Sequence, residues 1–148
     1  MTVGAEEFLF TIFRRAQLEK KEIPAICKSR PRRDGIVSFP AMMLDFDRIK
    51  SGEPWFFNIS TFWLPAGPEP FRARLANIAY TYVIVLDDIG DHPKSKVSWD
   101  TLRAFPLKPN YILATREAEG RYNCQVGYFL APTEPVKAVR LINGLIDD

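Results

Sequence analysis

The chain has 148 residues, of which 47% are hydrophobic and 13% aromatic, and its formal net charge is +2. These values are typical of a folded domain with its own core, so we expect residues 1–148 to form a single domain and exclude a disordered chain. No apolar run reaches the roughly 18 residues of a membrane span, and the N-terminus lacks a signal-peptide pattern. We therefore expect a cytoplasmic protein with no membrane partner. One histidine and two cysteines argue against zinc ligation and His-based nucleophilic catalysis.

Hydrophobic periodicity and turn residues predict an α+β chain, with about five strands and helices that cover one face of the sheet. Residues 5–20 carry apolar side chains at the i, i+3, i+4 spacing of a helix. Residues 55–63 alternate in the manner of a strand. In the first half of the chain, the other predicted elements are short strands at 25–27 and 36–39, a helical turn at 42–49 and a helical turn or loop at 72–77. In the second half they are a strand at 80–88, a helix at 99–105 capped by Ser98, and a hairpin of strands 111–115 and 122–130. A last helix begins at 133 or 134, and its apolar face carries Val136, Val139, Leu141, Ile142, Leu145 and Ile146.

The strand at 80–88 ends in two neighbouring carboxylates, Asp87 and Asp88, with Gly90 two residues later. An unpaired charge at the end of a buried strand is costly, so these groups need hydrogen bonds, basic partners or a metal ion. Neighbouring strand residues point to opposite faces, so both carboxylates reach one ion only if the strand bends at the pair, which Gly90 permits. The available oxygen ligands favour Mg²⁺ or Mn²⁺. The alternative is a pair of carboxylates that form and cap a turn.

Basic residues bracket this acidic strand in the sequence. They are Arg72, Arg74, Lys94 and Lys96. Exposed positive charge of this kind attracts nucleic acid, which makes these four residues candidate nucleic-acid contacts. The alternative is that they are solvated loop residues, as most runs of charge are.

Six segments and a helix follow one another in a fixed order: WFFNIS at 55–60, LDDIG at 86–90, SKV at 95–97, YILAT at 111–115, GRYNCQ at 120–125, GYFL at 127–130 and the helix at 138–146. In this order and spacing, residues 54–146 resemble the archaeo-eukaryotic primase superfamily, most closely the RepB-like primase-polymerase domains of phage and plasmid replication proteins. The resemblance implies a DNA primase or DNA polymerase, a template-directed nucleotidyltransferase of DNA replication, with an RRM-like mixed or antiparallel sheet. Its partners would be a single-stranded DNA template, nucleoside triphosphates and a helicase domain of the same parent protein.

The resemblance also implies roles for individual residues. The first motif of the family supplies two acidic ligands for Mg²⁺ or Mn²⁺, and it falls on Asp87 and Asp88. The second motif is a hairpin whose hydroxyl and polar residues contact the incoming nucleotide, and it falls on Thr115, Asn123 and Gln125. Many relatives have a histidine where this chain has Gln125. Arg116 and Arg121 border the hairpin turn, and their guanidinium groups are suited to grip a triphosphate.

The chain departs from the family pattern in two places. Residues 91–94 lengthen the loop before SKV, and the third acidic motif, which relatives carry beyond the last helix, is missing. Asp147 and Asp148 follow a helix and are poor substitutes for it. The chain is therefore either part of a longer replication protein, and an enzyme if the third acid lies outside it, or a catalytically incomplete module that binds single-stranded nucleic acid or nucleotides. A further interpretation is a protein-interaction domain whose carboxylates cap a turn.

Overall fold

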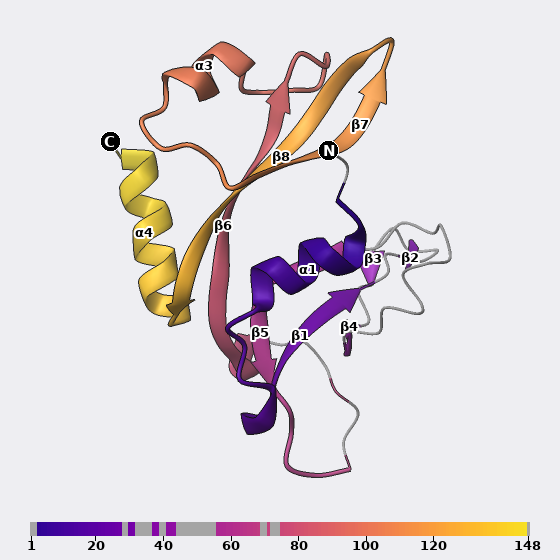
Figure 1. The fold of residues 1–148 in the computed structure, drawn as a ribbon, viewed down its shortest axis with the longest axis vertical. Helices are drawn as coiled ribbons and strands as arrows, with labels where there is room; N and C mark the ends of the chain where they lie inside the picture. Colours follow the sequence, from indigo (N-terminus) through magenta and orange to yellow (C-terminus); the bar gives the residue numbers. More distant parts are fainter. Residues whose placement is uncertain are drawn as a thin grey trace. The chain divides into compact units, whose positions relative to one another are not determined.

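The computed structural model describes residues 3–27, 30–31, 37–38, 41–43, 56–68, 71 and 75–147. Its helices and strands (Figure 1) are, in chain order, α1 (Ala5–Phe13), η1 (Leu18–Lys20), β1 (Glu22–Cys27), β2 (Arg30–Pro31), β3 (Val37–Ser38), β4 (Ala41–Met43), β5 (Phe56–Trp63), η2 (Leu75–Asn77), β6 (Ile78–Gly90), α3 (Trp99–Ala104), β7 (Tyr111–Ala118), β8 (Arg121–Thr133) and α4 (Pro135–Asp147). Among the described helices, none combines the length and the hydropathy that a membrane crossing requires.

A six-stranded sheet with the order β4-β1-β5-β6-β8-β7 organises the chain, and β2 and β3 pair separately. The pairs of β1 with β4 and β5, of β5 with β6, and of β7 with β8 are antiparallel. The neighbouring strands β6 and β8 also run in opposite directions in Figure 1. The predicted α+β class is therefore confirmed, with an antiparallel sheet and helices in an arrangement consistent with an RRM-like fold.

The chain divides into two compact units, a first unit of residues 1–82 with 131–148 and a second unit of residues 83–130. β6 and β8, of 13 residues each, contribute to both units. The prediction of a single domain stays a prediction. The two aspartates and the predicted hairpin residues all belong to the second unit.

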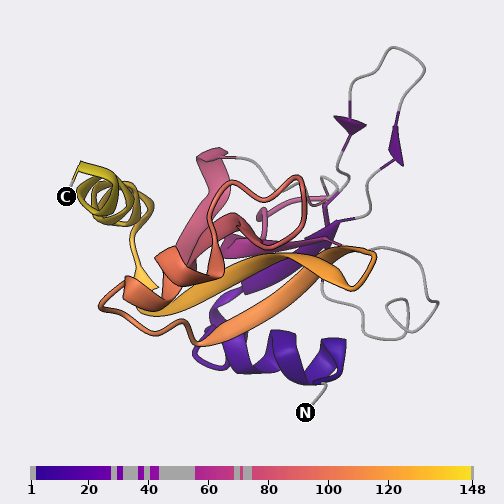
Figure 2. The same ribbon diagram turned by 90° about the horizontal axis from the view of Figure 1, so that it is seen from above.

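In the first unit, α1 lies on one face of the sheet, against β1 and β5 (Figure 2). Its apolar face buries Leu9, Ile12 and Phe13, as the i, i+3, i+4 spacing predicted. The ring of Phe13 meets the ring of Tyr82 on β6 edge to face, with centroids 5.5 Å apart. Aromatic contacts of this kind add to the area that the helix buries, and they fix it on the sheet.

Glu22, at the start of β1, is completely buried in the first unit. Its Oε1 accepts hydrogen bonds from Thr61 Oγ1 at 2.6 Å and from the Tyr82 hydroxyl at 2.7 Å. Its Oε2 accepts a bond from the backbone N–H of Gln17 at 2.9 Å. A buried carboxylate is tolerated only when donors surround it, and here they come from three separate parts of the chain.

Three predicted elements differ in the structure. The helix predicted over 5–20 ends at Phe13 because the chain turns through η1 and a left-handed Lys21 (φ 64°) to bring Glu22 into β1. β1 begins at Glu22 rather than at residue 25. Its register shifts after Pro24, because a proline lacks the N–H that a regular ladder needs. The turn predicted over 42–49 is wrong at Met42 and Met43, which pair with β1 as part of β4, and the rest of that turn lies outside the described residues.

The last helix forms as predicted, but three residues of its predicted apolar face stay exposed. Val136, Val139 and Leu141 are 66%, 56% and 48% exposed, whereas Ala138 is buried. Helix formation follows from local periodicity and the N-terminal Pro135, whereas burial depends on which surface the helix meets.

In the second unit, α3 begins where Ser98 caps it, with Ser98 Oγ accepting from the N–H of Thr101 at 3.2 Å. Leu102 of α3 packs with Ile89 of β6 and Val126 of β8, and this cluster holds the short helix on the strands. The predicted hairpin is β7–β8, and its two-residue turn at Glu119 and Gly120 has positive φ at both positions (53° and 73°), as type I′ turns require.

Candidate functional site

The end of β6 bends at the aspartate pair. Asp88 has a left-handed φ of 59° and Gly90 a φ of 144°. Aspartate is one of the few residues with a side chain that tolerates the left-handed region. Gly90 has to be glycine, because a Cβ there would overlap the carbonyl oxygen of Tyr122. The left-handed Asp88 breaks the alternation of a regular strand at the position where the metal hypothesis needs a bend.

After this bend the loop of residues 91–98 folds back onto the strand end. The backbone carbonyl of Asp88 accepts hydrogen bonds from the N–H groups of Lys96 at 2.7 Å and Val97 at 3.1 Å. The N–H of Gly90 in turn donates to the carbonyl of Val97 at 2.9 Å. These bonds bring the side chain of Lys96 to the Asp88 carboxylate.

Two side chains hold the Asp88 carboxylate. The Lys96 ammonium lies 2.8 Å from Oδ2, and the amide nitrogen of Asn123 donates to Oδ1 at 3.1 Å. The hydrogen bonds from Lys96 and then from Asn123 hold the pKa of Asp88 below its ordinary value, and the Arg116 guanidinium acts in the same direction. The bond to Asp88 raises the pKa of Lys96. Asp88 is therefore ionised, oriented and electrically balanced.

Asp87 is exposed, and its Oδ1 accepts the backbone N–H of Asp88 at 2.9 Å. Its charge also helps to raise the pKa of Lys96. Burial, and after it the charge of Asp87, raises the pKa of Tyr111 on β7. The two carboxylates thus act on one lysine and on the hairpin, although the same bond to the Asp88 N–H is what a turn-capping aspartate would make.

Asn123 connects the strand end to the hairpin. It is 2% exposed on β8, and while its amide nitrogen binds Asp88, its Oδ1 accepts from Ser95 Oγ at 2.7 Å. Its backbone carbonyl accepts from Thr115 Oγ1 on β7 at 3.0 Å. Both ends of the side-chain amide are occupied by the protein, so Asn123 positions Asp88. This positioning role has no sequence signal, because the partners of Asn123 lie 28 and 35 residues away.

The other predicted hairpin residues line β7 and β8. The register shifts between Ala114 and Arg116, which leaves Thr115 as the extra residue of a bulge, and bulges re-aim side chains in this way. Arg116 is exposed, with its charge acting on Asp88, whereas Arg121 lies exposed at the turn with no described contact to the aspartates. Gln125 is half-buried, and its Oε1 accepts from the Tyr111 hydroxyl at 3.3 Å.

Tyr111 was not among the predicted site residues. Its ring lies over Gly127, its partner in the β7–β8 register, and a Cβ at Gly127 would overlap that ring. The bare glycine lets the tyrosine lie flat on the hairpin, with its hydroxyl directed to Gln125. This pairing of a tyrosine with a glycine depends on the strand register, so the sequence alone did not indicate it.

The four predicted nucleic-acid contacts have different outcomes. Lys96 is bound to Asp88, Lys94 is exposed in the loop, and Arg72 and Arg74 lie outside the described residues. The structure adds a basic patch in the first unit that sequence reasoning did not single out. It consists of the exposed residues Arg14, Arg15, Lys20 and Lys21.

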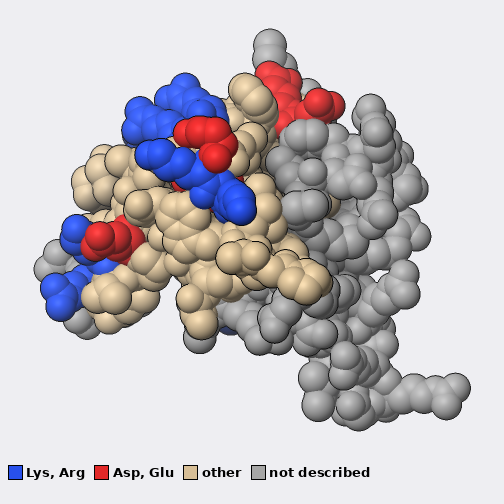
Figure 3. Space-filling model, turned by 90° about the horizontal axis from the view of Figure 1, so that it is seen from below, with Lys and Arg blue, Asp and Glu red and all other residues tan. Residues whose placement is uncertain are grey.

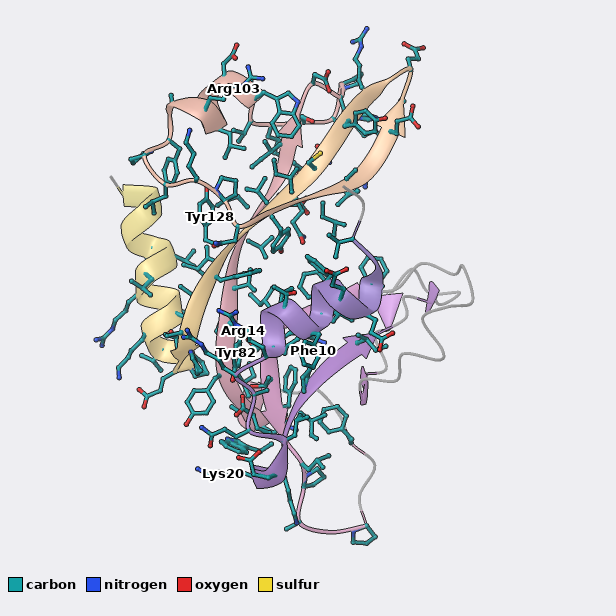
Figure 4. All side chains as sticks on the ribbon, viewed as in Figure 1. Phe10, Arg14, Lys20, Tyr82, Arg103 and Tyr128 are labelled. Atoms are coloured by element: carbon teal, nitrogen blue, oxygen red, sulfur yellow. The ribbon has the colours of Figure 1, made fainter. Side chains whose placement is uncertain are left out.

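Figure 3 shows Lys and Arg side chains gathered on one face with a smaller acidic area among them, and Figure 4 labels Arg14 at the end of α1 and Lys20 in η1. Within the described part of the chain, none of the four patch residues takes part in an ion pair. The signal in the sequence is the two basic pairs at 14–15 and 20–21, which stand on either side of the segment at 16–19.

A divalent ion would have two carboxylate ligands here. Among residues with described positions, no group of three or more His, Cys, Asp or Glu side chains is placed to hold a metal. The donor chemistry of Asp87 and Asp88 nevertheless fits Mg²⁺ or Mn²⁺, because a carboxylate has about four lone-pair sites and the hydrogen bonds described use only part of them. Asp87 and Asp88 are the residues that would hold such an ion.

Comparison of the chain with protein-family models, with curated proteins and with solved structures gave no match.

Proposed function

We propose that this chain is the primase-polymerase domain of a phage or plasmid replication protein, with Mg²⁺ or Mn²⁺ held by Asp87 and Asp88. One observation supports it most: the strand bends at Asp88, and Asn123 of the hairpin binds the Asp88 carboxylate at 3.1 Å. The two segments that the resemblance assigns to metal and to nucleotide are therefore adjacent in space, although 35 residues separate them.

The reaction would join a hydroxyl oxygen to the α-phosphorus of a nucleoside triphosphate and release pyrophosphate. A bound divalent ion would activate the hydroxyl and stabilise the leaving pyrophosphate. The chain's own residues position the site: Asn123 donates to the Asp88 carboxylate, and Ser95 donates to Asn123. Arg116, exposed and near enough for its charge to act on Asp88, would bind phosphate oxygens.

The remaining hairpin residues would contact the nucleotide. Thr115 stands on a bulge beside Asn123 and offers a hydroxyl, and Gln125 retains its amide nitrogen as a donor while its oxygen binds Tyr111. Arg121 lies near the hairpin tip, from which a long side chain could meet the outer phosphates. The Gln125 amide nitrogen and the two guanidinium groups form a donor set suited to a polyanion, whereas the Thr115 hydroxyl already donates to the Asn123 carbonyl and has only acceptor lone pairs left.

The template would be a single strand of DNA, bound by its phosphates. The basic patch of Arg14, Arg15, Lys20 and Lys21 offers four exposed cations for this purpose. Binding of this kind releases counterions and weakens steeply as salt is added. The third acid of the family would come from the parent replication protein, together with its helicase domain.

The test is incorporation of labelled nucleotide on single-stranded DNA with Mn²⁺, by this chain and by the parent replication protein. Asp88→Ala should lower the rate by at least about 100-fold, since an interaction with a catalytic metal contributes that much or more. Asp100→Ala is the matched control, because Asp100 is an exposed aspartate of α3 whose side chain, among the described residues, pairs with Arg103. Equal rates for the Asp88→Ala variant and the unmodified protein would contradict the proposal.

A second candidate is a module of the same fold that binds single-stranded nucleic acid or nucleotides without catalysis. The absence of a third metal-ligating side chain near Asp87 and Asp88 in the described part of the chain favours it. Salt-dependent DNA binding with no incorporation, even by the parent protein, would select this function. If neither oligonucleotides nor Mn²⁺ bind, the aspartates act as turn caps in a protein-interaction domain.

A further inference from the structure

The ammonium of Lys96 occupies the position beside the Asp88 carboxylate that a metal ion would occupy. Its Nζ is 2.8 Å from Asp88 Oδ2, and in the described part of the chain it is the residue that forms an ion pair with Asp88. A divalent ion on the same oxygen would lie next to this ammonium, and two cations so close repel each other. The metal proposed above and Lys96 therefore compete for one position.

The lysine side chain can separate from the Asp88 carboxylate while the Lys96 backbone stays bound to the Asp88 carbonyl. The Lys96 side chain is 79% exposed, and the Asp88 side chain is 29% exposed. Exposed lysine–carboxylate pairs contribute little stability, and the lysine stem is flexible. The backbone N–H groups of Lys96 and Val97, in contrast, remain tied to the carbonyl of Asp88.

The second partner of the carboxylate is of a different kind. Asn123 is buried, neutral and bound to the other oxygen, Oδ1. It would keep Asp88 oriented whether Lys96 or a metal occupies Oδ2. The carboxylate thus has one permanent partner and one exchangeable partner.

We propose that Lys96 forms the ion pair with Asp88 in the metal-free protein and is displaced when the divalent ion binds. Its ammonium then binds the triphosphate. This inference rests on the proposed function. A metal alone has to expel a cation from the site. A metal that arrives with a triphosphate brings a new partner for that cation, so the two ligands bind with positive coupling.

Mn²⁺ binding, followed by the electron paramagnetic resonance signal of free Mn²⁺, tests the exchange on the full chain without nucleotide. Lys96→Gln should bind Mn²⁺ about threefold to fivefold more tightly than the unmodified protein, as expected for loss of an exposed ion pair. Lys96→Arg keeps the charge and should bind Mn²⁺ as the unmodified protein does. Lys108→Gln removes an exposed lysine elsewhere in the second unit and should have no effect.

The same titrations with a non-hydrolysable nucleoside triphosphate test where the ammonium goes. The triphosphate should raise the Mn²⁺ affinity of the unmodified protein by a larger factor than that of Lys96→Gln. The role of Lys96 is overturned if Lys96→Gln binds Mn²⁺ no more tightly than the unmodified protein, or if the triphosphate raises the Mn²⁺ affinity of both proteins by the same factor. The proposed metal site still stands in that case, provided that Asp88→Asn abolishes Mn²⁺ binding. If Mn²⁺ binds to none of these proteins, the metal site is overturned, and the exchange with it.

Discussion

Asn123 on β8 donates a hydrogen bond of 3.1 Å to Asp88 Oδ1 at the end of β6, and the asparagine is 2% exposed. This bond joins the two segments on which the proposed chemistry depends. The amide nitrogen of Asn123 faces the Asp88 carboxylate, so an aspartate side chain of the same shape would place a carboxylate oxygen there.

Asn123→Asp should therefore create a third carboxylate next to Asp87 and Asp88. Without metal, the like charges should lower the melting temperature. With Mn²⁺, the rise in melting temperature should exceed that of the unmodified protein by about 3–5 °C, the shift expected for roughly tenfold tighter binding.

The measurement is a thermal melt with and without Mn²⁺. The matched control is Asn110→Asp, because Asn110 Oδ1 accepts a bond from the N–H of Phe129 that an aspartate could also accept. A Mn²⁺ shift for Asn123→Asp that is no larger than for the control would count against a metal at Asp88.

Gly90→Ala should destabilise the protein by about 2–4 kcal/mol, because the residue combines an unfavourable φ with a steric overlap. At Gly90 φ is 144°, and a Cβ would strike the carbonyl oxygen of Tyr122. Gly67→Ala is the control, since nothing lies within 4 Å of a Cβ there. Urea denaturation would measure both, and similar stabilities for the two variants would contradict the close approach of β6 and β8.

The basic patch should govern the salt dependence of DNA binding. Replacing Arg14 and Lys20 with glutamine should make the slope of log K against log salt shallower by about 1.4, if each contact with a single strand contributes about 0.7. Arg103→Gln with Lys108→Gln changes the net charge equally but lies in the second unit, where Arg103 is paired with Asp100. If both double variants reduce the slope equally, DNA binding depends on the total charge and not on the basic patch.

Tyr82→Phe should destabilise the protein by about 1–3 kcal/mol, because it deprives the buried Glu22 carboxylate of one hydrogen-bond donor. The Tyr82 hydroxyl lies 2.7 Å from Glu22 Oε1. Tyr80→Phe, on the same strand, keeps its ring contact with Trp63 and should have a much smaller effect. Chemical denaturation of the two variants gives the comparison, and a larger loss for Tyr80→Phe would refute the role given to the buried pair.

Cys124 should react slowly with alkylating reagents in the folded protein. Its thiol is buried on β8, and burial, with a smaller effect from Asp91, raises its pKa above the ordinary 9.0. The folded state therefore keeps the thiol proton to a higher pH than the unfolded state, and this group makes folding less stable as pH rises above the unfolded pKa. Iodoacetamide labelling at pH 8, localised by mass spectrometry, should be at least about tenfold slower than in urea. Equal rates would contradict the burial.

Local signals predicted much of the second unit. The apolar run before Asp87 predicted the strand that is now β6, the cap at Ser98 predicted α3, and the polar segment with Gly120 predicted the β7–β8 hairpin. In each case a few neighbouring residues carry the information, through periodicity, capping or turn chemistry. The same signals extended the first helix too far, because the burial of Glu22 overrides helical periodicity after Phe13.

The partners of these elements were beyond local signals. Lys96 looked like a template contact and is an ion-pair partner of Asp88, because the left-handed Asp88 turns the loop back on the strand. Asn123 looked like a nucleotide contact, and its amide is occupied by Asp88 and Ser95. Glu22 carried no signal at all, yet it is the buried centre of a hydrogen-bond network that includes Thr61 and Tyr82, 39 and 60 residues further along the chain.

The sequence by itself determined most of the longer elements, their order and the two aspartates at the end of a buried strand. Only the tertiary structure decided what those aspartates touch and which basic residues gather on one face. The reason is that periodicity is a property of neighbouring residues, whereas a side-chain partner depends on strand register, and a shift of one residue turns every side chain of a strand to the opposite face.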